Sequence, residues 1–350
     1  MVKSPAEGND MDGKLNLVGY DSPKTQSSGS FLVVDDGIAE MQSYSDKLEI
    51  LPLAKSLEKE QWLKEHLGPV PKKVLGFFVR ALPDAKIEKP LQACFFMKEK
   101  KAQVIHNVFV AEKNSQVHLI SGCTDDLVEG KHTGISLFFV RENASVSVTR
   151  IHHWSPDASV FSKSSVFVGK NAVFDSNYIV INSPKKEQAH SIARVDDGGA
   201  VGFNSIIFSR ENSDFTISDK ILLEGKNARA EIISRAISDG GRILTKTYMA
   251  GKGKDTRGHL ECDGILLNEK GSIHAIPELE AVNPKTNLSH EAGIGRISET
   301  ELSYLMARGI DEAKAKSLIV KGFLDAKINR IPPNLQKAID ELVGKISIQA

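Results

Sequence analysis

The sequence predicts a mainly β protein whose core is a β-helix, a solenoid of stacked coils, with helical segments at its N-terminal and C-terminal ends. Two observations support this fold class. From about Val104 onward, short strands rich in β-branched residues alternate apolar and polar side chains with a period of two. Tight polar turns built around Asn or Gly separate the strands, with middle residues at positions 114, 143, 171, 199, 212, 227, 241 and 271.

These turns recur at intervals close to multiples of about 14 residues. Asn and Gly accept the positive φ angles that tight turns require. A fixed period is the sequence signature of a solenoid, in which neighbouring coils bury each other's apolar faces. The alternative is a large antiparallel sandwich or meander, because its hairpins use the same turn residues. The regular spacing favours the solenoid.

The composition is that of an ordinary globular protein. Lys plus Arg and Asp plus Glu balance at 45 each and aromatic residues make up 6%, so nothing predicts a nucleic-acid partner. No apolar run approaches the length that spans a bilayer, and the first residues lack a basic-then-apolar export signal. The three widely spaced cysteines favour free thiols in a reducing compartment. We expect a cytoplasmic protein that binds neither a membrane nor nucleic acid.

The chain divides into four predicted segments. Residues 1–40 are rich in Gly, Ser and Asp and predict a mobile leader, in which residues 31–34 can pair as a short strand. Residues 41–100 form an N-terminal helical segment, because residues 41–68 combine good helix formers with Leu and Trp side chains that share one face. The repeat then defines a β-helix core over residues 101–297.

Residues 298–350 return to a helical period and form the last segment. Ser298 and Glu301 make a capping box, Gly309 follows the end of the first helix, and Asp311 caps the second. The predicted helices span residues 299–307, 312–329 and 334–345. Two interpretations of this segment stay open: it closes one end of the solenoid, as such folds require, or it docks a partner.

The stretch from 258 to 296 concentrates the side chains that bind metals and carry sulfur. It contains Cys262, three of the ten histidines and six acidic residues. Cys262 alternates in phase with Leu260, so it is either a small core residue or a thiolate that accepts sulfur or binds iron. Cys94 and Cys123 leave the same alternatives, and Cys123 is the better second candidate because polar residues follow it directly.

The cysteines cannot hold a finished cluster alone. No CxxC pair is present, and three cysteines cannot supply four thiolates, so a permanent four-thiolate cluster within one chain is excluded. A metal site must use His, Asp or Glu, borrow ligands from a second chain, or be transient. His290 and Glu291 are adjacent and face opposite ways on a strand, so only one of them shares a site with a given neighbour.

A second dense cluster is His152-His153-Trp154. It is either a strand with an exposed histidine and a packed tryptophan, or part of a functional site. No P-loop occurs, so we do not expect the chain to hydrolyse ATP by itself. Motifs for a serine hydrolase, a zinc protease or an EF-hand are also absent from the sequence.

The segment from His259 to Leu267 resembles the cysteine-containing strand of the SufB/SufD family of iron–sulfur cluster assembly proteins. Later segments complete the family's C-terminal pattern in order: residues 275–280, 289–293, 301–309 and 318–323. Together they cover about residues 258–325, and weaker similarity, including Ile151 to Trp154, runs back to about residue 100. The chain is most similar to the compact archaeal members.

The resemblance implies a β-helix flanked by helical segments and a scaffold role rather than an enzyme activity. It implies a SufC-type ABC ATPase partner, which hydrolyses the ATP and docks on the helical tail, and delivery of nascent clusters to apo iron–sulfur proteins. A chain with features of both SufB and SufD favours a homodimer. The docking residues are Leu302, Tyr304, Leu305, Arg308, Gly309, Leu318 and Phe323. The choice between homodimer and heterodimer, the cluster type, the sulfur and iron donors, and flavin binding in the complex stay open.

Several residues match the family's functional positions. Cys262 matches the cysteine on which SufB proteins build the nascent cluster, and Glu291 matches a carboxylate that assists there, so both are expected to bind iron transiently. His290 lies where SufD proteins place a functional histidine. His152 and Trp154 match a stretch implicated in moving sulfur, although SufB has Gln-Asn before the tryptophan. Secondary candidates are Cys123, His152, Trp154 and His259.

Two alternatives belong to other classes of protein. A β-helix enzyme acting on polysaccharide would display acidic and basic clusters along an outer groove, and such enzymes are often exported. A purely structural adaptor would use only its docking surface.

Overall fold

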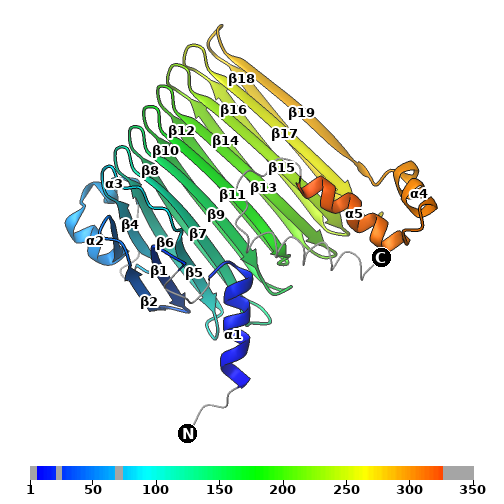
Figure 1. Ribbon diagram of the computed structural model, residues 1–350, viewed down its shortest axis with the longest axis horizontal. Helices are drawn as coiled ribbons and strands as arrows, with labels where there is room; N and C mark the ends of the chain where they lie inside the picture. Colours follow the sequence, from blue (N-terminus) through cyan, green and yellow to red (C-terminus); the bar gives the residue numbers. More distant parts are fainter. Residues whose placement is uncertain (1–5, 21–25, 68–73, 326–350) are drawn as a thin grey trace.

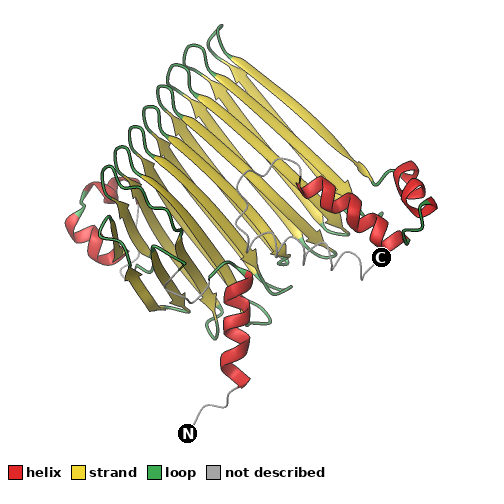
Figure 2. Cartoon of the chain, in the orientation of Figure 1, coloured by secondary structure: helices red, strands yellow, loops and turns green. Residues whose placement is uncertain are grey.

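The structure is a computed structural model that describes residues 6–20, 26–67 and 74–325 (Figure 1). It confirms the predicted fold class: the protein is mainly β, and most of the described chain winds into a flattened β-solenoid of two stacked sheets. Each coil contributes one strand to each sheet, which explains the half-coil spacing of the turns in the sequence. Helices occur only at the two ends of the described chain (Figure 2).

Sheet A has ten strands in the order β19-β17-β15-β13-β11-β9-β7-β5-β1-β2. Its strands are β1 (Gly29–Val34), β2 (Gly37–Ser43), β5 (Leu91–Met97), β7 (Gln116–Asp125), β9 (Ser145–His153), β11 (Val173–Asn182), β13 (Ala200–Arg210), β15 (Arg229–Asp239), β17 (Arg257–Leu266) and β19 (Asn287–Arg296). All neighbours are parallel except β1 and β2, which form an antiparallel pair.

Sheet B has nine strands in the order β18-β16-β14-β12-β10-β8-β6-β4-β3. Its strands are β3 (Leu48–Pro52), β4 (Phe77–Ala81), β6 (Ala102–Ala111), β8 (Lys131–Val140), β10 (Ser159–Val168), β12 (Lys186–Val195), β14 (Asp214–Leu223), β16 (Arg242–Gly251) and β18 (Ser272–Ala281). Only the first pair, β3 and β4, is antiparallel.

The turns that lead from sheet B to sheet A stack into a ladder of residues with positive φ. The ladder consists of Asp84, Asn114, Asn143, Asn171, Gly198, Asn227 and Asp255. Their φ values lie between 54° and 64°, a region that Asn, Asp and Gly tolerate best. Asn143 Nδ2 donates to Asn114 Oδ1 at 3.0 Å and Asn114 Nδ2 donates to Asp84 Oδ1 at 2.7 Å, so successive coils are joined at this corner.

For two turns, the sequence pattern predicted the residue that follows the one with the positive φ. At two turns the positive φ belongs to Gly198 and Gly240 rather than to their neighbours Gly199 and Gly241. Asp255 was not part of the predicted repeat, although its φ is 59°. Successive ladder residues are between 27 and 30 positions apart along the chain, so the length of a coil varies.

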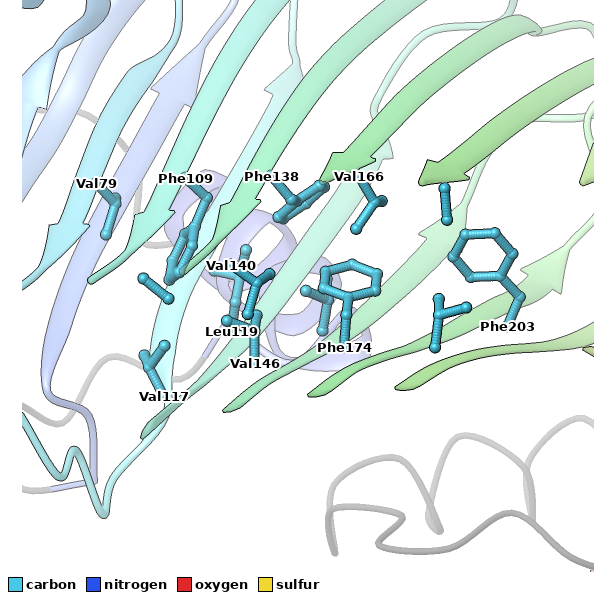
Figure 3. Packing of buried hydrophobic residues seen from close by; sticks show 14 of the residues in the cluster. Val79, Phe109, Val117, Leu119, Phe138, Val140, Val146, Val166, Phe174 and Phe203 are labelled. Carbon is cyan, nitrogen blue, oxygen red and sulfur yellow. The ribbon is translucent and has the colours of Figure 1, made fainter. Parts of the chain in front are cut away.

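The space between the sheets is filled mainly by apolar side chains that neighbouring coils share. Phe109, Phe138, Phe174 and Phe203 follow one another along the solenoid, with ring centroids 6.1, 5.1 and 6.4 Å apart (Figure 3). Each aromatic ring contacts a ring from another strand of the stack. A single coil therefore buries its apolar face only when its neighbours are present.

The described residues of the predicted leader include a helix and side chains that pack on the solenoid. Helix α1 (Ala6–Leu17) precedes β1, and Leu15, Val18 and Tyr20 pack in an apolar cluster on the outer face of sheet A. The low overall hydrophobicity of this region gave no sequence signal that its few apolar side chains pack on sheet A.

The predicted helix over 41–68 is shorter in the structure, and strands occupy part of the N-terminal helical segment. Helices α2 (Leu53–Lys59) and α3 (Trp62–Leu67) follow β3, and their Leu53 and Leu63 side chains cover the outer face of sheet B beside Phe139. Strand pairing between β3 and β4 overrides the local helical pattern, since it extends sheet B at its edge.

The C-terminal helices begin where the capping residues predict. Ser298 accepts a hydrogen bond from the backbone N–H of Glu301 at the start of α4 (Glu299–Ala307), and Gly309 has a φ of 84° after its end. Asp311 Oδ1 accepts from the backbone N–H of Lys314 at 3.0 Å at the start of α5 (Glu312–Asp325). The predicted third helix and the end of the second lie outside the described residues.

Helix α5 lies against the outer face of sheet A, where Val320 and Leu324 join the apolar cluster that also holds Ile237 of β15. No helix in the described part of the chain is long and apolar enough to cross a membrane.

Candidate functional site

One inward-facing row of side chains on each sheet is polar, although its surroundings are apolar. On sheet A, strand register aligns Ser121, Arg150, Tyr178, Ser205, Ser234 and Cys262. On sheet B it aligns Asn107, Ser136, Ser164, Ser191, Asp219 and Thr247. We call these the polar rows. They face each other, because Arg150 Nη1 donates to Ser164 Oγ at 2.7 Å.

Cys262 occupies a late position in the sheet A row. Its side chain is 3% exposed, between Ser234 on β15 and Ala292 on β19. Burial raises the pKa of the thiol to about 11, against the opposing effect of the nearby Thr247 hydroxyl. The thiol is therefore protonated at neutral pH in this conformation. Cys262 is buried, as a core residue would be, but its neighbours in the row are polar.

Several buried polar atoms along or beside the rows lack a hydrogen-bond partner among the described residues. They are Arg150 Nε, Trp154 Nε1, Glu187 Oε2 and Ser234 Oγ. Such atoms are rare in native interiors, where buried polar groups are normally satisfied by protein or by water.

The structure separates Glu291 from Cys262. Strand register pairs Glu291 with Glu261 on the outer face of sheet A, whereas Cys262 points between the sheets. His290 pairs with Leu260 and faces the same side as Cys262. Both His290 and Glu291 are exposed, because β19 is the last strand of sheet A. Among the described residues, no three His, Cys, Asp or Glu side chains are grouped to hold a metal ion.

The outer face of β17 carries a charged cluster that includes the predicted candidate His259, but sequence reasoning missed Arg235 at its centre. Arg235 on β15 forms a buried ion pair with Glu261 and a second one with Asp263 at 3.1 Å. The Arg235 guanidinium lies 5.6 Å from the ring centroid of Phe323 on α5. His259 Nδ1 lies 2.9 Å from Ser289 Oγ on the same face. The two carboxylates that flank Cys262 in sequence are therefore tied through Arg235 to the C-terminal helix.

Cys123 and His152 form a second cluster between the sheets. They are direct neighbours on β7 and β9. His152 Nδ1 lies 2.8 Å from Glu187 Oε1 and 3.1 Å from the hydroxyl of Tyr178, which donates to the same carboxylate. Burial lowers the pKa of His152, but Cys123 and Glu187 outweigh it and raise the pKa to about 9. His152 is therefore an imidazolium at neutral pH.

The buried side chain of Trp154 packs beside this cluster, 5.9 Å from His152 and 4.9 Å from His132 between ring centroids. Burial, with the charge on His152, lowers the pKa of His132 to about 3. Of these two histidines, His152 is therefore positively charged at neutral pH and His132 is neutral. Glu187 and Tyr178, from β12 and β11, complete the cluster but lie far from His152 in the sequence, which offers no signal for them.

Cys94 differs from both other cysteines. It is fully buried in the apolar cluster on the outer face of sheet A, and this burial raises the pKa of its thiol well above the ordinary value.

The predicted docking residues fall into two groups. Leu302 is 8% exposed, Leu305 is partly buried, and Phe323 contacts Arg235, so these side chains pack within the protein. The exposed residues are Tyr304, Arg308, Gly309 and Leu318. Arg308 lies over the Tyr304 ring at 5.1 Å and donates to its hydroxyl at 3.0 Å, so the two form one exposed feature.

A family profile described as "SUF system FeS cluster assembly, SufBD core domain" matches residues 95–323, which include both polar rows and helix α4. The chain belongs to the SufBD family. The resemblance noted in the sequence is thereby confirmed, and SufBD proteins take part in iron–sulfur cluster assembly.

Individual relatives extend the similarity along most of the chain. An "Iron-sulfur cluster assembly SufBD family protein" from Archaeoglobus fulgidus is 39% identical over 93% of this chain and 92% of its own length. A relative with the same description from Methanothermobacter thermautotrophicus is 33% identical over 92% of this chain and 84% of its own. One from Pyrococcus horikoshii is 32% identical over 77% and 61%.

Proposed function

We propose that this SufBD protein is a scaffold on which a nascent iron–sulfur cluster is assembled at Cys262. The observation that carries the proposal is the position of this thiol. It belongs to a row of polar side chains between the sheets, and only one further strand, β19, separates it from the end of the described solenoid. A thiol kept protonated in a closed site is protected until its surroundings open, because the thiolate is the reactive form.

The polar rows give sulfur a route to Cys262. Sulfur enters at Cys123, which lies beside His152 on the neighbouring strand. The thiolate attacks the outer sulfur of a donor persulfide, the new S–S bond forms, and the donor thiolate leaves. Two equivalents of a small thiol then reduce this persulfide to the Cys123 thiol and hydrosulfide, and leave as a disulfide. The hydroxyl groups of Ser205 and Ser234 line the way of the hydrosulfide toward Cys262.

Iron is held at the open end of the solenoid, where His290 faces the same side as Cys262. Glu291 joins this site only after β19 shifts, because it now lies on the other face of sheet A. We therefore assign the first iron contact to His290 and a later one to Glu291.

A second copy of the chain completes the site. Strands β18 and β19 are the last strands of their sheets and pair on one side only within the described residues. Their unpaired backbone groups and the exposed side chains of Leu279 and Ile294 offer a surface on which a second solenoid end can pair. The homodimer would supply further ligands for the cluster before it is delivered to an apo iron–sulfur protein.

The C-terminal helices dock a SufC-type ABC ATPase. Tyr304 and Leu318 are 59% and 44% exposed, which is high for large apolar side chains. Phe323 faces inward and contacts Arg235, whose carboxylate partners flank Cys262. Movement of the bound ATPase is thus transmitted from α5 through Arg235 to β17, which opens the surroundings of Cys262.

Co-purification with the ABC ATPase tests this docking. We expect Leu318→Asp to reduce recovery of the ATPase at least about tenfold, because a carboxylate at the centre of an apolar contact costs more than 1.4 kcal/mol. Lys314→Ala, on the same helix and also exposed, is the matched control and should leave recovery unchanged. Equal recovery with both variants, at unchanged melting temperature, would place the docking surface elsewhere.

A further inference from the structure

Arg150 is a cation set into the middle of the solenoid. Its side chain extends between the sheets, where Nη1 donates to Ser164 Oγ at 2.7 Å and Nη2 donates to Ser176 Oγ at 3.2 Å. The guanidinium also lies 5.2 Å from the ring centroid of Tyr178. These partners are all neutral. Within the described residues no carboxylate forms an ion pair with Arg150, and its Nε has no hydrogen-bond partner.

Arg150 lines two cavities of about 20 Å³ each, one shared with strands that follow β9 and one shared with strands that precede it. Asp219 also lines the first cavity, and the negative charge of its carboxylate offsets the positive charge of Arg150 there. The second is lined by Asn107, Ser121 and Ser136 together with apolar side chains, and it contains no acidic residue. Arg150 is the one charged side chain among the described residues that line it.

The polar groups of the second cavity can all donate hydrogen bonds. The Asn107 carbonyl oxygen already accepts from the backbone N–H of Phe77 at 3.3 Å, which leaves its amide hydrogens for another partner. The hydroxyls of Ser121 and Ser136 form no hydrogen bond with another described residue and can rotate to donate. One cation and three neutral donors suit an anion, because hydrogen bonds to charged groups are the stronger kind.

We propose that this second cavity is a binding site for a small monovalent anion of the hydrosulfide type, held by Arg150, Asn107, Ser121 and Ser136. The volume excludes oxyanions such as sulfate, since a cavity of this size holds little more than a single water molecule. The proposal rests on the proposed function in one respect. Hydrosulfide is the inorganic sulfur from which clusters are built, and the site lies in the same polar rows as Cys262.

Bromide is a suitable probe because it is a monovalent anion of similar size to hydrosulfide and gives an anomalous X-ray signal. We expect crystals of the full-length protein grown from sodium bromide to show an anomalous peak in the second cavity. Adding sodium hydrosulfide under anaerobic conditions should displace that peak. Bromide peaks confined to the outer surface of the wild-type protein would overturn the proposal.

Three variants define the site. Arg150→Met should lower bromide affinity about 10- to 100-fold, the usual effect of losing a buried charged hydrogen bond. Ser136→Val should also remove the peak, because its methyl groups fill part of the cavity without removing a buried charge. Asp219→Asn is the opposite control and should strengthen the peak, because a negative charge near the guanidinium is lost. An unchanged peak in Ser136→Val, or a weaker one in Asp219→Asn, would contradict the assignment.

The readout is independent of cluster assembly. If bromide binds as expected while Cys262→Ala still assembles clusters, the scaffold proposal fails and the anion site stands. If bromide does not bind while Cys262→Ala loses its cluster, the anion site fails and the scaffold stands.

Discussion

Cys262 differs from the other two cysteines in what surrounds its thiol. Cys94 lies in an apolar cluster on the outer face of sheet A, and Cys123 lies beside the His152 imidazolium. Cys262 is equally buried, but its neighbours are Ser234, Thr247 and the last strand of sheet A, β19. Sequence alternation predicted that Cys262 points inward with Leu260. It did not predict the polar row, which depends on strands that lie one coil apart.

The same limit explains the separation of Glu291 from Cys262. The two residues are 29 positions apart, and a coil of that length would have placed them side by side. The coil that contains them has 30 residues, so Cys262 pairs with Ala292. Because side chains alternate across a sheet, a difference of one residue moves Glu291 to the opposite face. Coil length varies along this chain, so the sequence pattern alone does not decide the face.

The charge on His152 makes stability depend on pH. Its pKa is raised from 6.5 to about 9 in the folded protein, so the folded state binds this proton more tightly than the unfolded state. The resulting stabilisation, on the order of 3 kcal/mol, is complete below pH 6.5 and is lost as the pH rises through 9. We expect the difference in unfolding free energy between wild type and His152→Gln, measured by chemical denaturation, to shrink over this interval.

Glu187→Gln is the matched control for this titration. It removes one of the two groups that raise the pKa of His152, so its own decline between pH 6.5 and 9 should be smaller than that of wild type. Parallel stability curves for wild type and His152→Gln across this range would show that the histidine is neutral.

At the scale of elements, the turn ladder is the feature that the sequence predicted best. Asn and Gly mark these turns in the sequence because few other residues accept a positive φ. That constraint acts within a single turn, so it can be recognised without knowing the rest of the fold. The ends of the solenoid were predicted less well. Helix α1 and strand β3 depend on contacts with sheets formed by distant residues, which override local composition.

Asn143 tests the contribution of the ladder. Its φ is 58° and its side chain donates to Asn114. We expect Asn143→Ala to lower the free energy of unfolding by about 1–2 kcal/mol, because alanine is strained in the left-handed region. Asn143→Gly keeps that backbone conformation without strain and should cost less. An equal loss for the glycine and alanine variants, in urea denaturation, would mean that the side-chain hydrogen bond that both variants lack, and not backbone strain, sets the cost.

Arg235 joins two elements, strand β17 and helix α5. Its side chain is 3% exposed and pairs with Glu261 and Asp263. We expect Arg235→Ala to lower the free energy of unfolding by about 3–5 kcal/mol, because removing one partner leaves a buried carboxylate uncompensated. Alkylation of Cys262, followed by mass spectrometry, should also become faster in this variant, since β17 is no longer tied to α5.

Lys270→Ala is the control for that measurement. Lys270 pairs with Glu211 at 3.1 Å, but both side chains are more than half exposed. Its loss should cost less than about 1 kcal/mol and leave the alkylation of Cys262 unchanged. If Arg235→Ala behaves like Lys270→Ala in both measurements, Arg235 does not couple α5 to β17.

At the scale of the whole molecule, the solenoid brings together residues that are scattered through the sequence. Cys123, Arg150 and Cys262 come from β7, β9 and β17, yet strand register directs all three side chains into the space between the sheets. The period of the repeat was sufficient to predict the solenoid, because each coil repeats the same local pattern. The contents of the interior were not predictable in the same way, since they are set by register between coils.

The proposed function depends most on Cys262, the residue that is proposed to hold the nascent cluster. The most direct measurement is anaerobic reconstitution with iron and sulfide, followed by counting both elements per chain in wild type, Cys262→Ala and Cys94→Ala. Cys94→Ala removes an equally buried thiol from an apolar cluster and is the matched control. We predict that Cys262→Ala retains less than about a tenth of the wild-type cluster and that Cys94→Ala retains nearly all of it. Wild-type amounts of iron and sulfide in Cys262→Ala would contradict the account.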